Sequence, residues 1–98
     1  MTDLIPAERP LDDIAPDLAQ AGWSRSGDGT AIVRSYRFAT FPDALAFMVR
    51  AGFAAEAAGH HPDWSNSYTR VEVSLSTHDA GGLTEKDIAL ARAMEALA

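Results

Sequence analysis

The spacing of apolar positions changes several times along the chain, and each change marks a predicted element. Residues 12–22 carry apolar side chains at helical spacing, so we expect one short helix with Pro16 in its first turn and Gly22 as its end. Residues 23–38 place the turn sequence GDGT before a run of β-branched and aromatic positions, which predicts a hairpin. Three positions are expected to share one face of its second strand: Ile32, Tyr36 and Phe38.

A long amphipathic helix is predicted next, over residues 41–59. Pro42 and Asp43 suit a helix start, and Gly59 suits a helix end. We expect its apolar stripe to face the core, because surface helices of globular proteins bury such a stripe. The stripe comprises Leu45, Met48, Val49, Gly52 and Phe53, with Glu56 one turn beyond.

The second half of the chain predicts a strand region followed by a helix. Residues 64–77 alternate apolar and polar positions, as one strand or as two that meet near Thr69. Thr84 then suits a helix N-cap, with Asp87 three residues on in a capping-box arrangement. The whole pattern predicts one α+β domain over residues 1–98, in which helices cover one face of an antiparallel sheet.

Composition and charge narrow the classes of partner. The net charge is −6 and the basic residues are scattered, so no patch is available to neutralise nucleic-acid phosphates. Cysteine is absent, no segment reaches the roughly 20 apolar residues of a membrane span, and the N-terminus lacks the pattern of an export signal. We therefore expect a cytoplasmic protein that binds neither nucleic acid nor membrane.

The histidines are the strongest candidates for chemistry. His60 and His61 follow the end of the long helix, and His78 follows the end of a strand. Imidazole has an ordinary pKa near ~6.5, so these side chains can donate and accept protons near neutral pH. Asp87 and Glu56 could orient them or stabilise their charge. Pro62 holds His61 extended, which helps to send the two neighbouring imidazoles in different directions.

Other interpretations of the histidines and of the residues that follow them remain open. A histidine pair after a helix is often a solvated cap that interacts with the helix dipole. A zinc site made of three histidines is weaker, because adjacent histidines rarely converge on one ion. Trp64, Asn66 and Tyr68 recur at period two and would form an aromatic face suited to a flat heterocycle, or they are core or interface residues.

Residues 56–87, EAAGHHPDWSNSYTRVEVSLSTHDAGGLTEKD, resemble the signature of the pterin-4a-carbinolamine dehydratases. That signature runs from a Glu through His-His-Pro-x-Trp-x-Asn-x-Tyr and a strand ending in Thr-His to Gly-Leu-Ser/Thr-x-x-Asp. The likeness extends from about Leu18 to the C-terminus. One departure is Ala57, where many members have Lys.

The resemblance implies a fold, an activity and a set of site residues. The fold is a four-stranded antiparallel sheet with about three helices packed on one face, assembled as a homodimer or homotetramer. The activity is a hydro-lyase reaction that converts 4a-hydroxytetrahydropterin to quinonoid dihydropterin and water in tetrahydropterin recycling, without a metal or bound cofactor. The implied catalytic residues are His60, His61 and His78, with Glu56, Trp64, Thr77 and Asp87 in binding or supporting roles.

Two points stay open within this resemblance. His60 and His78 are expected nearest the departing hydroxyl, but the sequence does not assign acid and base. The alternative function is a non-catalytic binding or assembly factor on the same fold, of the dimerisation-cofactor type. The histidine trio favours the enzyme, because a scaffold does not need three imidazoles in one pocket.

Overall fold

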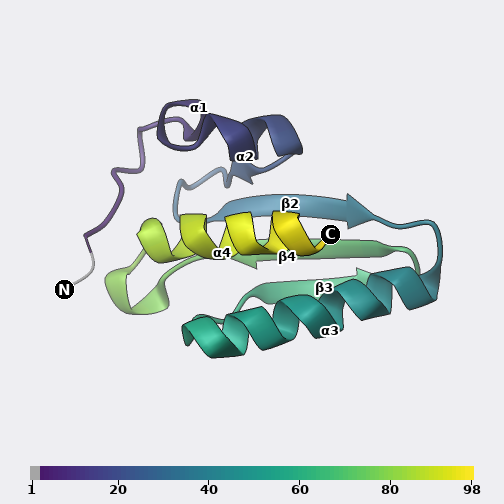
Figure 1. Cartoon of the computed structure of the whole chain (residues 1–98). Helices are drawn as coiled ribbons and strands as arrows, with labels where there is room; N and C mark the ends of the chain where they lie inside the picture. The colour runs from purple at the N-terminus through teal and green to yellow at the C-terminus, as the bar shows by residue number, and fades with distance from the viewer. Residues whose placement is uncertain (1–2) are drawn as a thin grey trace.

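The computed structural model describes residues 3–98 and has the predicted α+β architecture (Figure 1). No helix within these residues is long and apolar enough to cross a membrane. The elements follow in this order: α1 (Leu11–Ile14), α2 (Pro16–Ala21), β1 (Ser24–Arg25), β2 (Ile32–Arg37), α3 (Phe41–Ala58), β3 (Asp63–Ser67), β4 (Arg70–Leu75), the 3-10 helix η1 (His78–Ala80) and α4 (Glu85–Leu97).

The four strands form one antiparallel sheet in the order β1-β2-β4-β3. In the register of β2 and β4, Ile32 lies opposite Leu75 and Tyr36 lies opposite Val71, so these apolar side chains share the face covered by the helices. The opposite face is exposed and carries polar residues such as Ser35 and its partner Glu72. One buried and one solvated face is the usual arrangement of an antiparallel sheet.

Residues 64–77 form two strands, joined at Tyr68 and Thr69. Tyr68 has a φ of 54° in this turn and its side chain is exposed. The expectation that Tyr68 shares a strand face with Trp64 and Asn66 is therefore wrong. The Asn66 amide donates to the carbonyl oxygens of Tyr68 and Arg70, so it holds the turn rather than a ligand.

The prediction of one helix over residues 12–22 is also wrong in one respect. The chain breaks at Ala15, which has φ −150° and ψ 77°, and Pro16 begins a second helix. Proline lacks the N–H that a continuous helix needs, and it disfavours helical geometry in the residue before it. Gly22 ends α2 in the left-handed region with φ 118°, as predicted.

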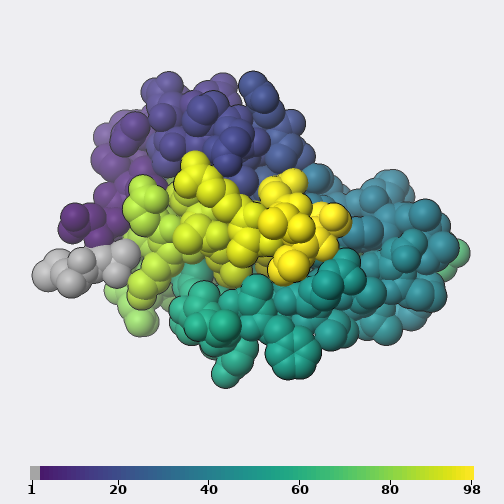
Figure 2. Space-filling model, in the orientation of Figure 1, coloured from purple at the N-terminus to yellow at the C-terminus, as the bar shows by residue number. Residues whose placement is uncertain are grey.

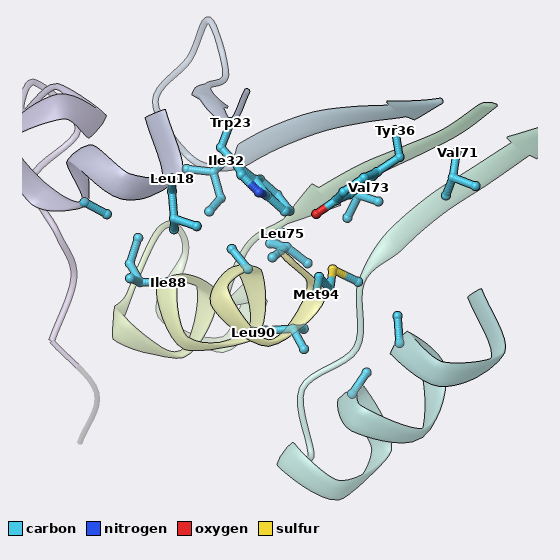
Figure 3. Packing of buried hydrophobic residues seen from close by; sticks show 14 of the residues in the cluster. Leu18, Trp23, Ile32, Tyr36, Val71, Val73, Leu75, Ile88, Leu90 and Met94 are labelled. Atoms are coloured by element: carbon cyan, nitrogen blue, oxygen red, sulfur yellow. The ribbon is translucent and has the colours of Figure 1, made fainter. Parts of the chain in front are cut away.

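The core lies between the sheet and the helices (Figure 3). Ile32 and Tyr36 are buried and Phe38 packs against them, which confirms their predicted common face. The ring centroids of Tyr36 and Phe47 are 4.7 Å apart, and those of Phe38 and Phe47 are 5.1 Å apart. Aromatic pairs at this separation stabilise the packing of α3 on the sheet, in addition to the effect of burying apolar surface.

A carboxylate on α4 links that helix to the sheet. Glu95 Oε2 accepts hydrogen bonds from Trp23 Nε1 at 2.9 Å, from Arg34 Nε at 3.1 Å and from the Tyr36 hydroxyl. Burial and the adjacent Glu95 carboxylate raise the pKa of Tyr36, so its hydroxyl stays protonated and keeps donating. This cluster fixes the rotation of α4, and with it the position of the helix start.

The ends of α3 match the prediction, but its buried face does not. Thr40 caps the helix by accepting a hydrogen bond from the Asp43 N–H, and Gly59 ends it with φ 63°. The buried residues are Ala44, Phe47, Ala51 and Ala55, whereas the predicted inward stripe is largely exposed. Phe47 fills the space over the sheet, and the three small alanines on the same face let α3 approach its neighbours closely.

Candidate active site

The candidate site is built where α3 ends. Gly59 turns the chain in the left-handed region, and the His60 N–H still bonds to the Ala55 carbonyl at 3.1 Å. The chain then runs extended through His61 and Pro62 into β3. As expected for this geometry, the two imidazoles point to different partners: His60 contacts Asp87 of α4, and His61 contacts Glu56 of α3.

His60 and Asp87 form a buried pair. His60 Nε2 lies 2.6 Å from Asp87 Oδ1, and the two side chains are 11% and 0% exposed. The other oxygen, Asp87 Oδ2, accepts from the Thr77 hydroxyl at 2.8 Å and from the Thr84 N–H at 2.9 Å. Because its other neighbours donate, the carboxylate acts as acceptor throughout, and we assign the His60 proton to Nε2.

The threonine hydroxyls behind this pair have one consistent hydrogen-bond order. Thr77 Oγ1 and Thr84 Oγ1 lie 2.6 Å apart. Since Thr77 donates to Asp87, Thr84 must donate to Thr77, and the Thr84 oxygen accepts from the Lys86 N–H at 3.3 Å. No buried side-chain N or O atom within residues 3–98 lacks a partner. Such a satisfied network holds its members in one geometry.

The predicted capping box of α4 is confirmed, and its acidic member has a second contact. Asp87 Oδ2 accepts from the backbone N–H of the N-cap residue Thr84, while Asp87 Oδ1 faces His60. One carboxylate therefore starts the helix and holds the imidazole. The position of His60 is therefore tied to the N-terminal cap of α4.

The other two histidines form exposed pairs. His61 Nε2 lies 2.8 Å from Glu56 Oε1, and His78 Nε2 lies 3.2 Å from Asp63 Oδ2. All four side chains are more exposed than buried. Water and salt weaken pairs of this kind, so they can part and re-form when a ligand arrives.

The three imidazoles line one pocket of about 210 Å³. Thr77 lies on its wall as well, and Asp87 stands behind His60. Glu56 and Trp64 were predicted to support the site, but neither lines this pocket. Glu56 reaches it only through His61, and Trp64 packs against the core. The full lining comprises Gly59, His60, His61, Ser76, Thr77, His78, Asp79 and Lys86.

Sequence reasoning missed two charged residues at this site. Lys86 lines the pocket, and Asp63 holds His78 from the start of β3. Lys86 stands next to Asp87 and Asp63 stands between Pro62 and Trp64, so both lay inside the motif. The contact of Asp63 with His78 depends on how β3 and η1 meet in space, and the place of Lys86 at the pocket depends on how α4 packs; spacing alone gives neither.

The fold and the site together define a class: a small α+β protein with three imidazoles around one pocket. A family model described as "Pterin 4 alpha carbinolamine dehydratase" matches residues 9–97. A Mesorhizobium japonicum protein named "Putative pterin-4-alpha-carbinolamine dehydratase" is 55% identical over 84 residues, which is 85% of this chain and 86% of that protein. The chain therefore belongs to the pterin-4a-carbinolamine dehydratase family, as the signature implied.

Solved structures agree on the fold. A crystal structure of a transcriptional coactivator/pterin dehydratase from Brucella melitensis has a TM-score of 0.82 and 38% identity, covering 98% of this chain and 99% of that chain. A pterin dehydratase-like protein identified as a RuBisCO assembly factor in the alpha-carboxysome has a TM-score of 0.67 and 23% identity, covering 78% and 88%. At that identity the second likeness concerns the fold alone.

Proposed function

We propose that this protein is a hydro-lyase that dehydrates 4a-hydroxytetrahydropterin to quinonoid dihydropterin. The observation that carries the proposal is the placement of His60, His61 and His78 around one pocket, with His60 held by a buried carboxylate. Membership of the dehydratase family supports the choice of substrate. The pocket has a volume of about 210 Å³, which suits a small ligand rather than a large one.

The reaction needs two proton transfers and no oxidant. The bond between C4a and the hydroxyl oxygen breaks as that oxygen takes a proton, and water leaves. The adjacent ring nitrogen supplies the electron pair of the new C=N bond, and a ring N–H proton passes to a base. Positioned imidazoles can perform both transfers. General acid–base catalysis of this kind raises the reaction rate on the order of 10²–10⁴-fold.

We assign the fixed role to His60 and the mobile roles to His61 and His78. His60 Nε2–H donates to Asp87, so the opposite ring atom, Nδ1, is the one that exchanges a proton with substrate. The negative charge of Asp87 stabilises an imidazolium formed during the reaction. His61 and His78 contact exposed carboxylates, which leaves them free to reorient toward the substrate hydroxyl.

The test is the rate of dehydration of freshly generated 4a-hydroxytetrahydropterin, followed by ultraviolet absorbance. The informative variant is His78→Ala, because His78 is exposed and its loss should leave the fold intact. A matched control is Glu72→Gln, an exposed change on the outer sheet face away from the pocket. We expect a wild-type rate well above the spontaneous reaction, a large loss in His78→Ala and no loss in Glu72→Gln.

Absence of acceleration by folded wild-type protein would overturn the proposal. It would leave the alternative, a binding or assembly factor that keeps this fold. Equal rates for wild type and His78→Ala would retain the activity but remove His78 from the mechanism.

A further inference from the structure

A second cavity adjoins the pocket of the candidate active site. It has a volume of about 260 Å³ and lies between the C-terminal half of α3 and the helix α4. It shares two lining residues with that pocket, His60 and Lys86. A ligand seated against the imidazoles can therefore extend past His60 into this second cavity, which we call the α3–α4 groove. The other residues that line the groove are Ala54, Ala58, Ala89, Leu90 and Ala93.

The two helices that form the α3–α4 groove run antiparallel and side by side (Figure 1), and Figure 2 shows α4 in yellow next to α3 in teal. Arg50, Ala54 and Ala58 recur at every fourth position, so they follow one line along α3. The helix rises about 1.5 Å per residue, so it advances about 12 Å from Arg50 to Ala58. Arg50 lies one turn beyond Ala54, on the side away from His60, and its guanidinium donates to the Leu97 carbonyl oxygen of α4 at 3.0 Å.

The walls of the α3–α4 groove are apolar except at the end that it shares with the pocket. Alanine methyl groups and the Leu90 side chain offer no hydrogen bond, and the two polar lining residues are His60 and Lys86. An apolar group gains free energy when it leaves water for such a surface, whereas a hydroxylated chain loses hydrogen bonds to water. The groove therefore favours an aryl or alkyl group.

Two cations flank the α3–α4 groove. Lys86, the only lysine of the chain, stands at the shared end, and Arg50 stands beyond the opposite end. Neither side chain belongs to an ion pair within residues 3–98. In a chain of net charge −6, such cations provide local sites for a negative group. The groove thus suits a ligand with an apolar body and an anionic end.

The connectivity of a pterin directs one of its substituents toward this groove. In the dehydration proposed above, C4a of the substrate lies within reach of His60, whose side chain lines both cavities. C6 is joined to C4a through N5 alone, so a substituent on C6 leaves the ring beside the reacting carbon. The amino group on C2 lies at the opposite edge of the ring system. The C6 substituent is therefore the part of the substrate that can pass His60.

We propose that the α3–α4 groove binds the C6 substituent of the pterin, and that it takes an aryl substituent ending in a carboxylate, as in folates. The inference rests on the proposed dehydratase function and names the class of its substrate. The aryl ring lies between the alanines of α3 and α4, and the carboxylate reaches Arg50. A short hydroxylated C6 chain gains no new hydrogen-bond partner from the apolar walls.

The first experiment measures binding without turnover, by isothermal titration calorimetry of the full chain. The ligands are three 7,8-dihydropterins that lack the hydroxyl on C4a: 6-methyl-7,8-dihydropterin, 7,8-dihydrobiopterin and 7,8-dihydrofolate. Burial of the aryl ring should make dihydrofolate bind roughly ten-fold more tightly than the 6-methyl compound. Dihydrobiopterin should bind within about two-fold of the 6-methyl compound, because its hydroxyl groups find no partner in the groove.

The outcomes separate this inference from the proposed activity. Equal affinity for dihydrofolate and the 6-methyl compound would overturn the groove and leave the dehydratase proposal standing. A clear preference for dihydrofolate in a protein that does not accelerate dehydration would overturn the activity alone. Failure of folded protein to bind any of the three compounds would overturn the groove together with the pterin pocket.

Ala89→Leu and Ala96→Leu form a matched pair on α4. Both alanines are exposed, but only Ala89 lines the groove. Leucine is a good helix former, so both variants should keep the circular dichroism spectrum of the wild type. Ala89→Leu fills the groove, so the preference for dihydrofolate over the 6-methyl compound should fall from roughly ten-fold to near one, while Ala96→Leu keeps it. An undiminished preference in Ala89→Leu would contradict the placement of the aryl ring.

Arg50→Gln tests the anionic end of the ligand. Loss of one exposed ion pair should weaken dihydrofolate binding by about two- to five-fold, with no change for the 6-methyl compound. The difference from wild type should shrink in about 0.5 M salt, which screens the pair. Arg37→Gln, at the exposed end of β2, is the control and should change neither affinity. Equal losses for both ligands in Arg50→Gln, or no loss, would contradict the contact of the carboxylate with Arg50.

Discussion

The three histidine–carboxylate pairs have the same chemistry and very different surroundings. The His60–Asp87 pair is buried, and Asp87 also accepts from Thr77 and from the first turn of α4. The pairs His61–Glu56 and His78–Asp63 are exposed, and each carboxylate has one side-chain partner among residues 3–98. The same type of contact, a histidine against a carboxylate, therefore does not impose the same constraint in each place.

This difference indicates that the buried pair and the exposed pairs have different roles. A buried pair whose carboxylate accepts three hydrogen bonds is held in one geometry, and breaking it leaves an uncompensated charge. An exposed pair exchanges with water at little cost. In the dehydration that we propose, His60 keeps a fixed position while His61 and His78 follow the substrate as the hydroxyl departs. The following variants test whether the buried and exposed pairs differ as much as this comparison implies.

Asp87→Asn should have the largest effect. The amide cannot accept all the hydrogen bonds that the carboxylate accepts, and it removes the charge that faces His60. We expect the free energy of unfolding to fall by roughly 2–4 kcal/mol, from the lost cap and the buried unsatisfied group. Denaturant unfolding followed by circular dichroism measures this change.

Glu85→Gln is the control for Asp87→Asn. It removes a carboxylate from the same first turn of α4, but Glu85 is exposed. It should change stability by less than about 0.5 kcal/mol. Similar losses of unfolding free energy in the two variants would mean that Asp87 acts only through the helix dipole. The buried pair with His60 would then make no separate contribution to stability.

Thr77→Val should have the next largest effect. Valine keeps the shape of threonine but removes the donor to Asp87 and leaves the buried Thr84 hydroxyl without its acceptor. We expect a loss of about 1–2 kcal/mol in the free energy of unfolding. Turnover should also fall through the altered position of His60, while Thr69→Val, in the β3–β4 turn, changes neither. Unchanged turnover in Thr77→Val would restrict the threonine to a structural role.

Much of the fold could be predicted from the sequence, because the relevant signals are local. Gly22, Gly59 and the Thr84 capping box mark helix ends by backbone chemistry that does not depend on distant residues. The face of α3 that is buried could not be predicted in this way. Its apolar positions surround most of the helix, so the choice between the alanine face and the face with Leu45 and Phe53 depends on how closely the helix can pack.

For the candidate site too, the sequence predicts local features but not the contacts between residues that are distant in the chain. The histidines, Thr77 and Asp87 stand in a motif that the sequence displays directly, and the structure brings them together. The motif does not say which carboxylate serves which imidazole. Asp63 contacts His78 across 15 positions, and that contact exists only because β3 pairs with β4.

Glu56→Gln and Asp63→Asn should have small effects on stability. Each removes the charge from an exposed pair, and such pairs contribute about 0–1 kcal/mol. We expect less than 0.5 kcal/mol in denaturant unfolding, and little further change when salt is raised to 0.5 M, because salt already screens these contacts. Losses near that of Asp87→Asn in either variant would remove the contrast between buried and exposed pairs.

Two explanations could account for the contrast between the buried and the exposed pairs: burial of the carboxylate, or the number of hydrogen-bond donors fixed around it. Asp28 distinguishes them. It is exposed, yet it accepts from the Thr30 N–H and from the hydroxyls of Ser26 and Thr30. The Thr30 N–H, followed by those hydroxyls, lowers the pKa of Asp28 to about 2. A depressed pKa adds stability above the unfolded value near ~3.9, and that stability is lost as pH falls toward 2.

An NMR titration of the Asp28 carboxyl should therefore give a midpoint near 2, and Ser26→Ala should raise it toward the ordinary value. Ser65→Ala, on the exposed strand β3, is the control and should leave it unchanged. An ordinary midpoint in the wild type would mean that exposure alone cancels the effect of fixed donors. A depressed midpoint would mean that donors set by the backbone constrain a carboxylate even in water. The rigidity of Asp87 would then follow from the Thr84 N–H and the Thr77 hydroxyl as much as from its burial.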